Sequence, residues 1–215
     1  FESFSNVYTF TIDPTRHPGR SIVMRTSFLF TFIVLSANLP LMGYEAMHEK
    51  TPVGGIRVLE LPKRIALEAK SPQGYFSENN GLFRTLFGYI SKHDLSMTTP
   101  VEAEIKPGKM RFFVGEKDAA KKRPKTAKVE VINLDPITVV AIGIRGSYSS
   151  ENFQKHEKLL LEWIDDNPNY ETSGTAYAVY WDGPFIPWLL KRSEVHLPIR
   201  SSQKESKKNQ PSKKQ

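Results

Sequence analysis

Side chains suited to catalysis are sparse in this sequence and widely spaced. The chain has no cysteine, which excludes thiolate chemistry and disulfide bonds. It contains neither a G-x-S-x-G nucleophile motif nor a G-x-x-x-x-G-K-[ST] phosphate loop. The five histidines lack the H-x-x-x-H spacing that places two imidazoles on one metal: His17, His48, His93, His156 and His196. We therefore expect a protein that is not an enzyme and that has no dedicated metal site.

A cluster of aromatic residues indicates binding instead. Phe83, Phe87 and Tyr89 fall within seven residues, on the flank of an apolar helical stripe. The aliphatic members of that stripe, which we assign to core packing, are Leu82, Leu86 and Ile90. The three aromatic residues either join this core or line a flat apolar cleft of the kind that a porphyrin occupies.

Candidate iron ligands and candidate partners for ligand carboxylates lie near the same stripe. A haem iron takes its axial ligand most often from His, Met, Cys or Tyr. His93 and Met97 come directly after the stripe, and His48 lies further upstream; a surface or core role is the alternative for each. Carboxylates at a cleft rim would suit arginine and lysine. The cations considered for that role, which would otherwise be ordinary surface charges, are Arg57, Arg84, Lys92 and Arg111.

The stripe predicts a helix over residues 78–91, with Ser77 as its N-cap. Alternation of apolar and polar residues then predicts a strand over residues 97–105. Pro100 lacks an N–H group, so we expect an edge strand or a bulge there. Glu102 and Glu104 fall on the polar side of this strand and are interpreted as surface charge.

The pattern of the first half returns in the second half. In the first half, the helix is accompanied by strands expected around residues 56–59, 65–69 and 110–114. The second half contains a helix that Ser149 or Ser150 caps and that ends near residue 166. Its strands are expected around residues 129–134, 140–146, 174–181 and 195–199. Each half therefore reads as strand, helix, strand, strand. Two such units joined at their edges predict an α+β fold, with a curved antiparallel sheet and two main helices alongside it.

Several segments resemble the SOUL haem-binding protein family. FRTLFGYIS (residues 83–91) followed by SMTTPV (residues 96–101) is similar to that family's helix and Met-Thr-x-Pro-Val strand. The runs YEAMHEKTPVGGIRVLELPKRIALEA (residues 44–69) and FIPWLLKRSEVHLPI (residues 185–199) resemble its opening and closing strands. The resemblance covers residues 44–199. It implies an α+β barrel related to bacterial effector-binding domains.

The resemblance also implies non-covalent binding of haem or another tetrapyrrole, largely through hydrophobic contact. The candidate contact residues are Phe83, Arg84, Phe87, Tyr89 and Met97, with His93 as a weak candidate for the iron. Animal members place a Met-Lys pair where this chain has Phe87 and Gly88, so a lysine contact to a propionate is missing at that position.

Both termini differ in composition from the central region. Residues 1–43 contain a secretory-type pattern, with Met24-Arg25 before the apolar run at residues 28–35, and the uncharged stretch at residues 26–44 is close to the length of a membrane span. Export with cleavage, for example to a periplasm, an uncleaved membrane anchor and an upstream gene-start artefact are the three interpretations. Residues 200–215 hold six cations and one acid, most of the net charge of +7, and are expected to be a disordered basic tail. That tail lacks aromatic residues to stack on bases, so no nucleic-acid partner is expected.

Two functions are compatible with these features. The first is a non-catalytic tetrapyrrole-binding protein that holds the porphyrin in a hydrophobic groove beside the helix at residues 78–91. The alternative is an effector-binding-type sensor or scaffold for another small amphipathic ligand. A concave cavity with a buried carboxylate would favour the alternative, and Glu68 and Glu194 are its candidates.

Overall fold

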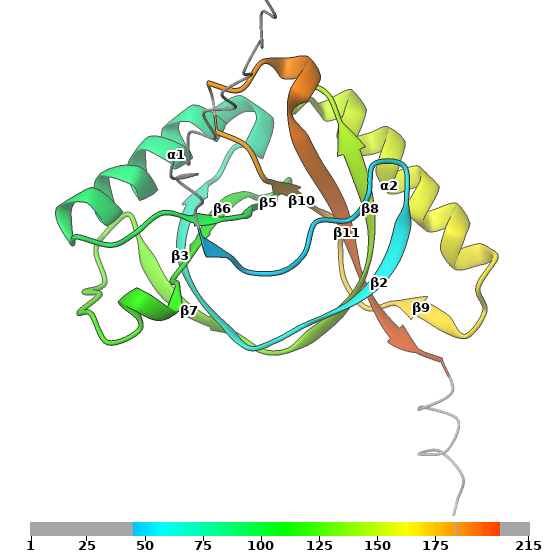
Figure 1. Ribbon diagram of the computed structural model, residues 1–215, viewed down its shortest axis with the longest axis horizontal. Helices are drawn as coiled ribbons and strands as arrows, with labels where there is room; N and C mark the ends of the chain where they lie inside the picture. The colour runs from blue at the N-terminus through cyan, green and yellow to red at the C-terminus, as the bar shows by residue number, and fades with distance from the viewer. Residues whose placement is uncertain (1–44, 184, 203–215) are drawn as a thin grey trace, which may run out of the picture. The chain divides into compact units, whose positions relative to one another are not determined.

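The main feature of the structure is one curled antiparallel sheet (Figure 1). The structure is a computed structural model that describes residues 45–183 and 185–202. The first half of the domain supplies β2 (Ile56–Leu61), β3 (Arg64–Ser71), α1 (Tyr75–Lys92), β5 (Val101–Glu104) and β6 (Gly108–Phe113). The second half supplies β7 (Glu130–Leu134), β8 (Ile137–Arg145), α2 (Ser150–Asp165), β10 (Tyr177–Tyr180) and β11 (Arg192–Ser201). Three short strands complete the set: β1 (Glu45–Ala46), β4 (Thr98–Thr99) and β9 (Tyr170–Thr172).

The structure describes only part of the chain for which domain boundaries were predicted. The predicted N-terminal extension, residues 1–43, lies outside the described residues, as does the tail beyond residue 202. β11 continues to Ser201 and so includes the first residues of the predicted tail. Among the described residues, no helix has the length and apolar character needed to cross a bilayer.

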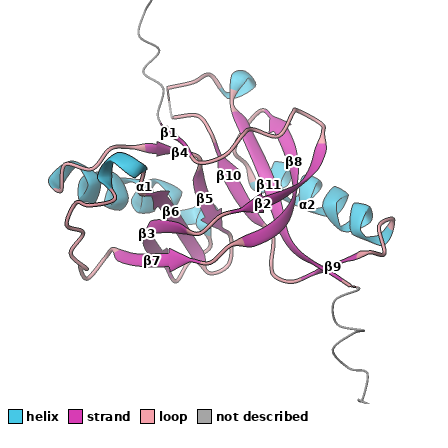
Figure 2. Ribbon diagram, turned by 60° about the horizontal axis from the view of Figure 1, so that its bottom comes forward, coloured by secondary structure: helices cyan, strands magenta, loops and turns pink. Residues whose placement is uncertain are grey.

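The sheet has an internal two-fold pattern in its strand order, β2-β8-β11-β10-β5-β6-β3-β7. β5 and β10 pair at the centre and join the two halves (Figure 2). Each half also lends a strand to the other, because β2 pairs with β8 and β7 pairs with β3. The predicted α+β fold with a curved antiparallel sheet is confirmed, and the exchanged strands are an addition that local periodicity does not reveal. The strand order ends at β2 and β7, which makes the sheet a half-barrel.

Both helices cover the outside of the curl (Figure 1). α1 packs against β3 and β6, and α2 packs against β8 and β11. The predicted start of α1 is wrong: the helix begins at Tyr75, with Gly74 as an N-cap that makes no side-chain hydrogen bond, and Ser77 lies inside the first turn. The physical reason is tertiary, since Tyr75 is buried and stacks on Tyr180 with ring centroids 5.7 Å apart. The predicted cap of α2 is confirmed, because Ser149 accepts a hydrogen bond from the backbone N–H of Asn152.

The strand predicted over residues 97–105 is divided at Pro100. Thr98–Thr99 forms β4, which pairs in parallel with β1, whereas β5 begins at Val101 and lies between β10 and β6. The expectation of an edge strand is therefore wrong for β5. Pro100 has no N–H group to donate to a neighbouring strand, so the strand pairing changes at this residue. The central strand β5 then contains only residues that have a backbone N–H group.

The inner face of the curl near β11 is organised by one carboxylate. Glu194 is 1 % exposed, and its Oε1 accepts hydrogen bonds from the Thr51 backbone N–H at 2.9 Å and from Trp181 Nε1 at 2.7 Å. Its Oε2 accepts from Thr51 Oγ1 at 2.8 Å and lies 2.9 Å from His196 Nε2. Burial acts to raise the pKa of Glu194, but the interactions with His196 and Thr51 outweigh it and lower that pKa to about 2.

Leu86 provides a test of the helix–sheet core. It is fully buried in α1, so Leu86→Ala leaves a cavity between α1 and the sheet. We expect the free energy of unfolding to fall by about 2–5 kcal/mol, measured by urea denaturation. Ser91→Ala on the exposed side of the same helix is the control and should change stability by about 0.5 kcal/mol or less. Equal effects of the two substitutions would contradict this packing.

Glu194 should make the fold sensitive to acid. The carboxyl group takes up a proton near pH 4.5 when unfolded but near pH 2 when folded, so its stabilisation is complete above pH 4.5 and is lost as the pH falls toward 2. The loss amounts to about 3 kcal/mol, to be measured as unfolding free energies between pH 5 and pH 2. Glu194→Gln should be less stable at pH 7 and should show a flatter dependence in this window. A slope identical to that of the unsubstituted protein would show that Glu194 does not control it.

Candidate functional site

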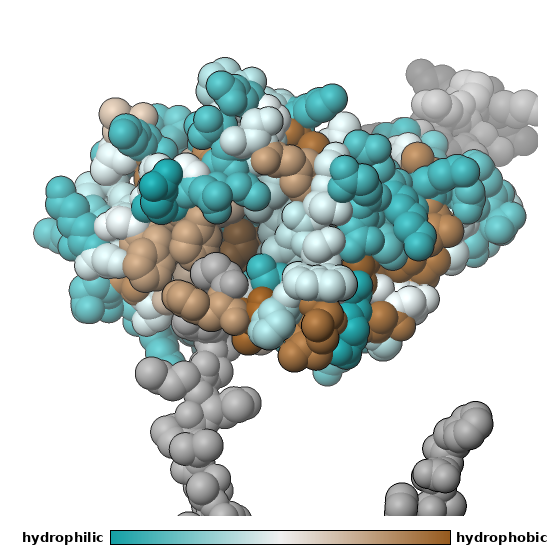
Figure 3. All heavy atoms as spheres, turned by 90° about the horizontal axis from the view of Figure 1, so that it is seen from above, coloured by the Kyte–Doolittle hydropathy of each residue, from teal (hydrophilic) through white to brown (hydrophobic). Residues whose placement is uncertain are grey.

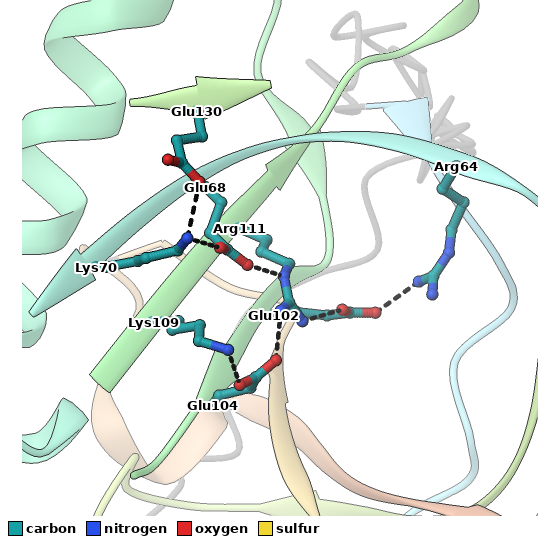
Figure 4. Close-up of polar contacts among 8 residues, drawn as sticks. All are labelled: Arg64, Glu68, Lys70, Glu102, Glu104, Lys109, Arg111 and Glu130. Atoms are coloured by element: carbon teal, nitrogen blue, oxygen red, sulfur yellow. Dashed lines mark hydrogen bonds and ion pairs between the residues drawn. The ribbon is translucent and has the colours of Figure 1, made fainter. Parts of the chain in front are cut away.

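The inner face of the half-barrel carries a ladder of ion pairs on β3, β5 and β6 (Figure 4). Arg111 stands opposite Glu68 and Glu102 in the strand register. Its Nε donates to Glu68 Oε2 at 2.6 Å, its Nη1 lies 3.8 Å from Glu102 Oε2, and its Nη2 donates to Glu104. The guanidinium of Arg64 meets the other side of Glu102, with Nη1 and Oε1 2.5 Å apart. One arginine therefore links three strands.

Every carboxylate of this ladder has a cationic partner. Four carboxylates (Glu68, Glu102, Glu104 and Glu130) are paired with Arg64, Lys70, Lys109 and Arg111, and Lys125 also lies 3.3 Å from Glu130. Burial acts to raise the pKa of Glu104, but Lys109 and Arg111 outweigh it and lower that pKa. The interpretation of Glu102 and Glu104 as surface charge is wrong, since Glu102 is 2 % exposed and both are ion-paired on the inner face. Alternation defines two faces of a strand without showing which face meets solvent.

The two carboxylates that would serve the alternative function are already engaged. Glu68 lies 3.3 Å from Lys70 Nζ and accepts from Arg111, and both oxygens of Glu194 have the partners described above. Neither is a free counter-ion for a cationic ligand. In the described part of the chain, no group of three or more His, Cys, Asp or Glu residues is placed to hold a metal ion.

A groove runs along one flank of α1, beside the end of β3 that extends past its pairing with β7. It consists of two adjoining hollows of about 530 and 470 Å³, and both are lined by Thr85 of the helix and by Ala127 and Lys128 of the segment that leads into β7. The lining includes buried apolar side chains, which we call the floor: Leu82 in the first hollow and Tyr89 and Val129 in the second. The expectation of a groove beside this helix therefore has a counterpart in the structure.

Small residues on α1 keep this flank open. Gly81, Thr85 and Gly88 follow at i, i+4 and i+7, which places them in one row along the helix. A Cβ atom added at Gly88 would meet nothing within 4 Å. The opposite wall is fastened to the helix by Tyr89, whose hydroxyl donates to the Pro124 carbonyl at 2.9 Å. The groove is therefore a built feature of the helix flank.

The two ends of the groove differ in charge. The first hollow is lined by three acids, Glu68, Glu78 and Glu130, together with Lys70 and Lys128. The second hollow is lined by Arg84, Lys92, Lys128 and His93, and by no acid. The second hollow thus offers an apolar floor beside several cations, an arrangement that suits a flat apolar ligand with carboxylates.

The structure separates the predicted contact residues into two sets. Arg84, Tyr89 and His93 line the second hollow, where the rings of Tyr89 and His93 lie 4.4 Å apart. Phe83 and Phe87 lie on the opposite flank, where their rings stack at 5.8 Å, and Phe83 also packs edge-on against Phe112.

The remaining candidates lie away from the groove lining. Met97 packs against the main core, and His48 lies against Trp181 with ring centroids 5.0 Å apart. Among the four candidate rim cations, Arg84 and Lys92 reach the groove, whereas Arg111 belongs to the inner ladder and Arg57 pairs with Glu49. Sequence reasoning missed Gly81 and Thr85 and interpreted Gly88 only as a lost lysine contact, although the spacing of the three along one helix flank was an available signal.

Comparison with solved structures finds a similar fold in other proteins. The crystal structure of the EcmrR C-terminal domain has a TM-score of 0.55 and 17% identity, and the match covers 68% of this chain and 98% of that one. EcmrR in a complex with DNA gives a TM-score of 0.56, 16% identity, and coverage of 68% and 57%. An uncharacterized conserved protein from Listeria innocua gives a TM-score of 0.52, 10% identity, and coverage of 70% and 94%. At these identities the likeness concerns the fold alone.

Sequence comparison identifies the family. A search of curated proteins finds no match. The family model described as "SOUL heme-binding protein" matches residues 42–198, which span both repeats, both helices and the groove. This chain therefore belongs to the SOUL haem-binding protein family.

Proposed function

We propose that the protein binds haem or a related tetrapyrrole without catalysis, in the groove between α1 and the segment 126–130. The observation that carries this proposal is the second hollow, where the apolar floor of Tyr89 and Val129 lies among Arg84, Lys92 and Lys128. The two hollows together approach the upper end of the usual range for small-molecule sites, about 300–1,000 Å³. The match to the SOUL family supports a tetrapyrrole as the ligand class.

The residues of the groove fit the two chemical parts of a porphyrin. The macrocycle is flat and apolar and would lie against the floor, beside the open row at Gly81, Thr85 and Gly88. The propionates would lie at the cationic end. Lys92 follows Gly88 by one helical turn on the same flank, so it supplies the charge that is missing at position 88. His93 lines the same hollow and is the candidate for an axial bond to iron.

The alternative is a sensor or scaffold that holds a different amphipathic ligand in the same groove. Glu78 lines the first hollow, and its carboxylate forms no ion pair with a described lysine or arginine, so this end would suit a lipophilic cation. Competition separates the two functions. If hemin binds the proposed site, a fluorescent lipophilic cation such as rhodamine 6G should not displace it at equal concentration.

Residues 26–44 remain a proposed export signal or membrane anchor. They lie outside the described residues, and the proposal depends on the apolar run after Met24-Arg25. Cell fractionation of the full chain, with and without residues 24–44, tests it.

Filling the groove should weaken hemin binding without weakening the fold. Hemin should bind the full chain one-to-one with a Kd in the micromolar range or below. Binding is measured by Soret absorbance in the presence of albumin as a competitor. Gly88→Leu places a side chain into the groove without a steric clash at Cβ, and leucine also has a higher helix propensity than glycine by about 1 kcal/mol. We expect at least a tenfold loss of affinity.

Asn80→Leu is the matched control for this substitution, because Asn80 lies on the same helix, is exposed and does not line either hollow. It should bind hemin as the unsubstituted chain does. Phe83→Ala with Phe87→Ala examines the opposite flank. Normal binding by Gly88→Leu together with a loss in the double phenylalanine variant would move the site to that flank.

Arg84 and Lys92 should recognise the propionates. Hemin dimethyl ester lacks the two negative charges, so the unsubstituted chain should prefer hemin to its ester. Arg84→Ala with Lys92→Ala should remove most of that preference, and measuring both ligands on both proteins gives the result directly. An unchanged preference would exclude these two cations from the site.

A further inference from the structure

The connection between β10 and β11 exposes a continuous run of large apolar side chains. The run is Phe185, Ile186, Trp188, Leu189 and Leu190, and it includes the short 3-10 helix η2 (Trp188–Leu190). Phe185 is 95 % exposed and Trp188 is 67 % exposed. η2 lies at the apex of the view in Figure 1, and Figure 3 looks down on this end, where brown patches interrupt the polar surface. Neither the core nor the groove accounts for these residues.

The base of this loop is tightly held, so the exposure of its tip is built into the fold. The Arg192 backbone N–H donates to Asp182 Oδ2 at 2.5 Å, and the Trp181 N–H donates to the Arg192 carbonyl at 3.1 Å. Tyr148 clamps both strands, because its hydroxyl accepts from the Asp182 N–H at 3.0 Å and donates to the Arg192 carbonyl at 2.7 Å. Within the loop, the Leu190 N–H donates to the Pro187 carbonyl.

Cations surround this base. Lys50 lies over the Trp181 ring at 5.1 Å, Lys191 lies over the Tyr148 ring at 4.8 Å, and Arg145 stands opposite Arg192 in the strand register. The acids near the base are Asp182, which accepts from a backbone N–H, Glu49, which pairs with Arg57, and the buried Glu194, which accepts from Trp181 Nε1. The apolar tip, residues 185–190, therefore projects from a base with excess positive charge. We call the cations of this base, Lys50, Arg145, Lys191 and Arg192, the collar.

We propose that residues 185–190 insert into the interfacial region of a lipid bilayer that contains anionic lipid, with Trp188 as the principal anchor. Large aliphatic and aromatic side chains beside lysine and arginine are the combination that interfacial segments use, since the tip enters the acyl boundary while the cations meet the headgroups. The near-complete exposure of Phe185 indicates a projecting tip. A projecting tip suits a fluid lipid surface better than the flat, shape-matched contact between two protein surfaces.

The position of the loop is compatible with the preceding sequence. His48 and Lys50 pack on Trp181 at the base of the loop. The uncharged stretch 26–44 ends four residues before His48, a distance of at most about 14 Å along an extended chain. A bilayer that held this stretch would therefore lie within reach of the collar.

Tryptophan fluorescence gives a direct test, because Trp188 is the exposed member of the three tryptophans. Trp181 is 5 % exposed, Trp163 is partly buried, and residues 1–44 contain no tryptophan. The full chain is mixed with phosphatidylcholine vesicles, with or without 30 mole per cent phosphatidylglycerol, in the absence of hemin. We expect a blue shift and quenching by brominated acyl chains, stronger with the anionic lipid. Both signals should disappear in Trp188→Phe.

Vesicle co-sedimentation completes the design. Phe185→Ser with Leu189→Ser should reduce partitioning at least tenfold, whereas Leu159→Ser with Leu161→Ser, at exposed positions on α2, should leave it unchanged. Binding of the full chain without quenching of Trp188 would overturn the proposal, since the contact would then lie elsewhere. Loss of a concentration-dependent dimer in Phe185→Ser with Leu189→Ser, without any vesicle effect, would overturn it in favour of a second copy of this chain.

Discussion

The guanidinium of Arg111 is the interaction on which the arrangement of this protein depends. It reaches carboxylates on β3 and β5 from its place on β6, at the inside of a sheet too strongly curled to leave that face fully solvated. A buried charge is costly unless it is paired, and here each of the four carboxylates of the ladder has at least one cationic partner. The charges of the inner face are therefore paired with one another, and the ligand site that we propose lies beside α1 instead.

The outer groove depends on the exchange of strands between the halves. β7 comes from the second repeat but pairs with β3 of the first, so the segment 126–130 is brought alongside α1 as a wall. The helix supplies the other wall with a row of glycine and threonine, whereas its buried stripe holds it on β3 and β6. Gly88 is well suited to such a position: it costs some helix stability and leaves open space beside the floor. The site is thus a product of both repeats.

Local patterns in the sequence were sufficient to predict the class of fold. They were insufficient to predict which face of each strand or helix is buried. The spacing from Leu82 to Ile90 predicted the helix, yet Tyr75 extends it through a contact with Tyr180 that lies far away in the sequence. Alternation located the strand that carries Glu102 but could not tell an inner charged face from a solvated one. The size of their aromatic rings led to the prediction of Phe83 and Phe87 as contact residues. The open flank instead consists of small residues, and they line a groove only because the segment 126–130, distant in sequence, lies opposite them. Arg84 and Tyr89, predicted for their charge and their ring, both line the second hollow.

Paramagnetic broadening by bound iron would locate the porphyrin on the protein directly. Backbone amide signals are recorded for the full chain with ferric hemin and with diamagnetic zinc protoporphyrin as the reference. Hemin bound in the groove should selectively broaden the signals of Gly81, Gly88 and Ala127 while those of Arg111 and Glu194, on the inner face, persist. Broadening centred on the inner face, or on Phe83 and Phe87, with the groove signals unchanged would contradict it.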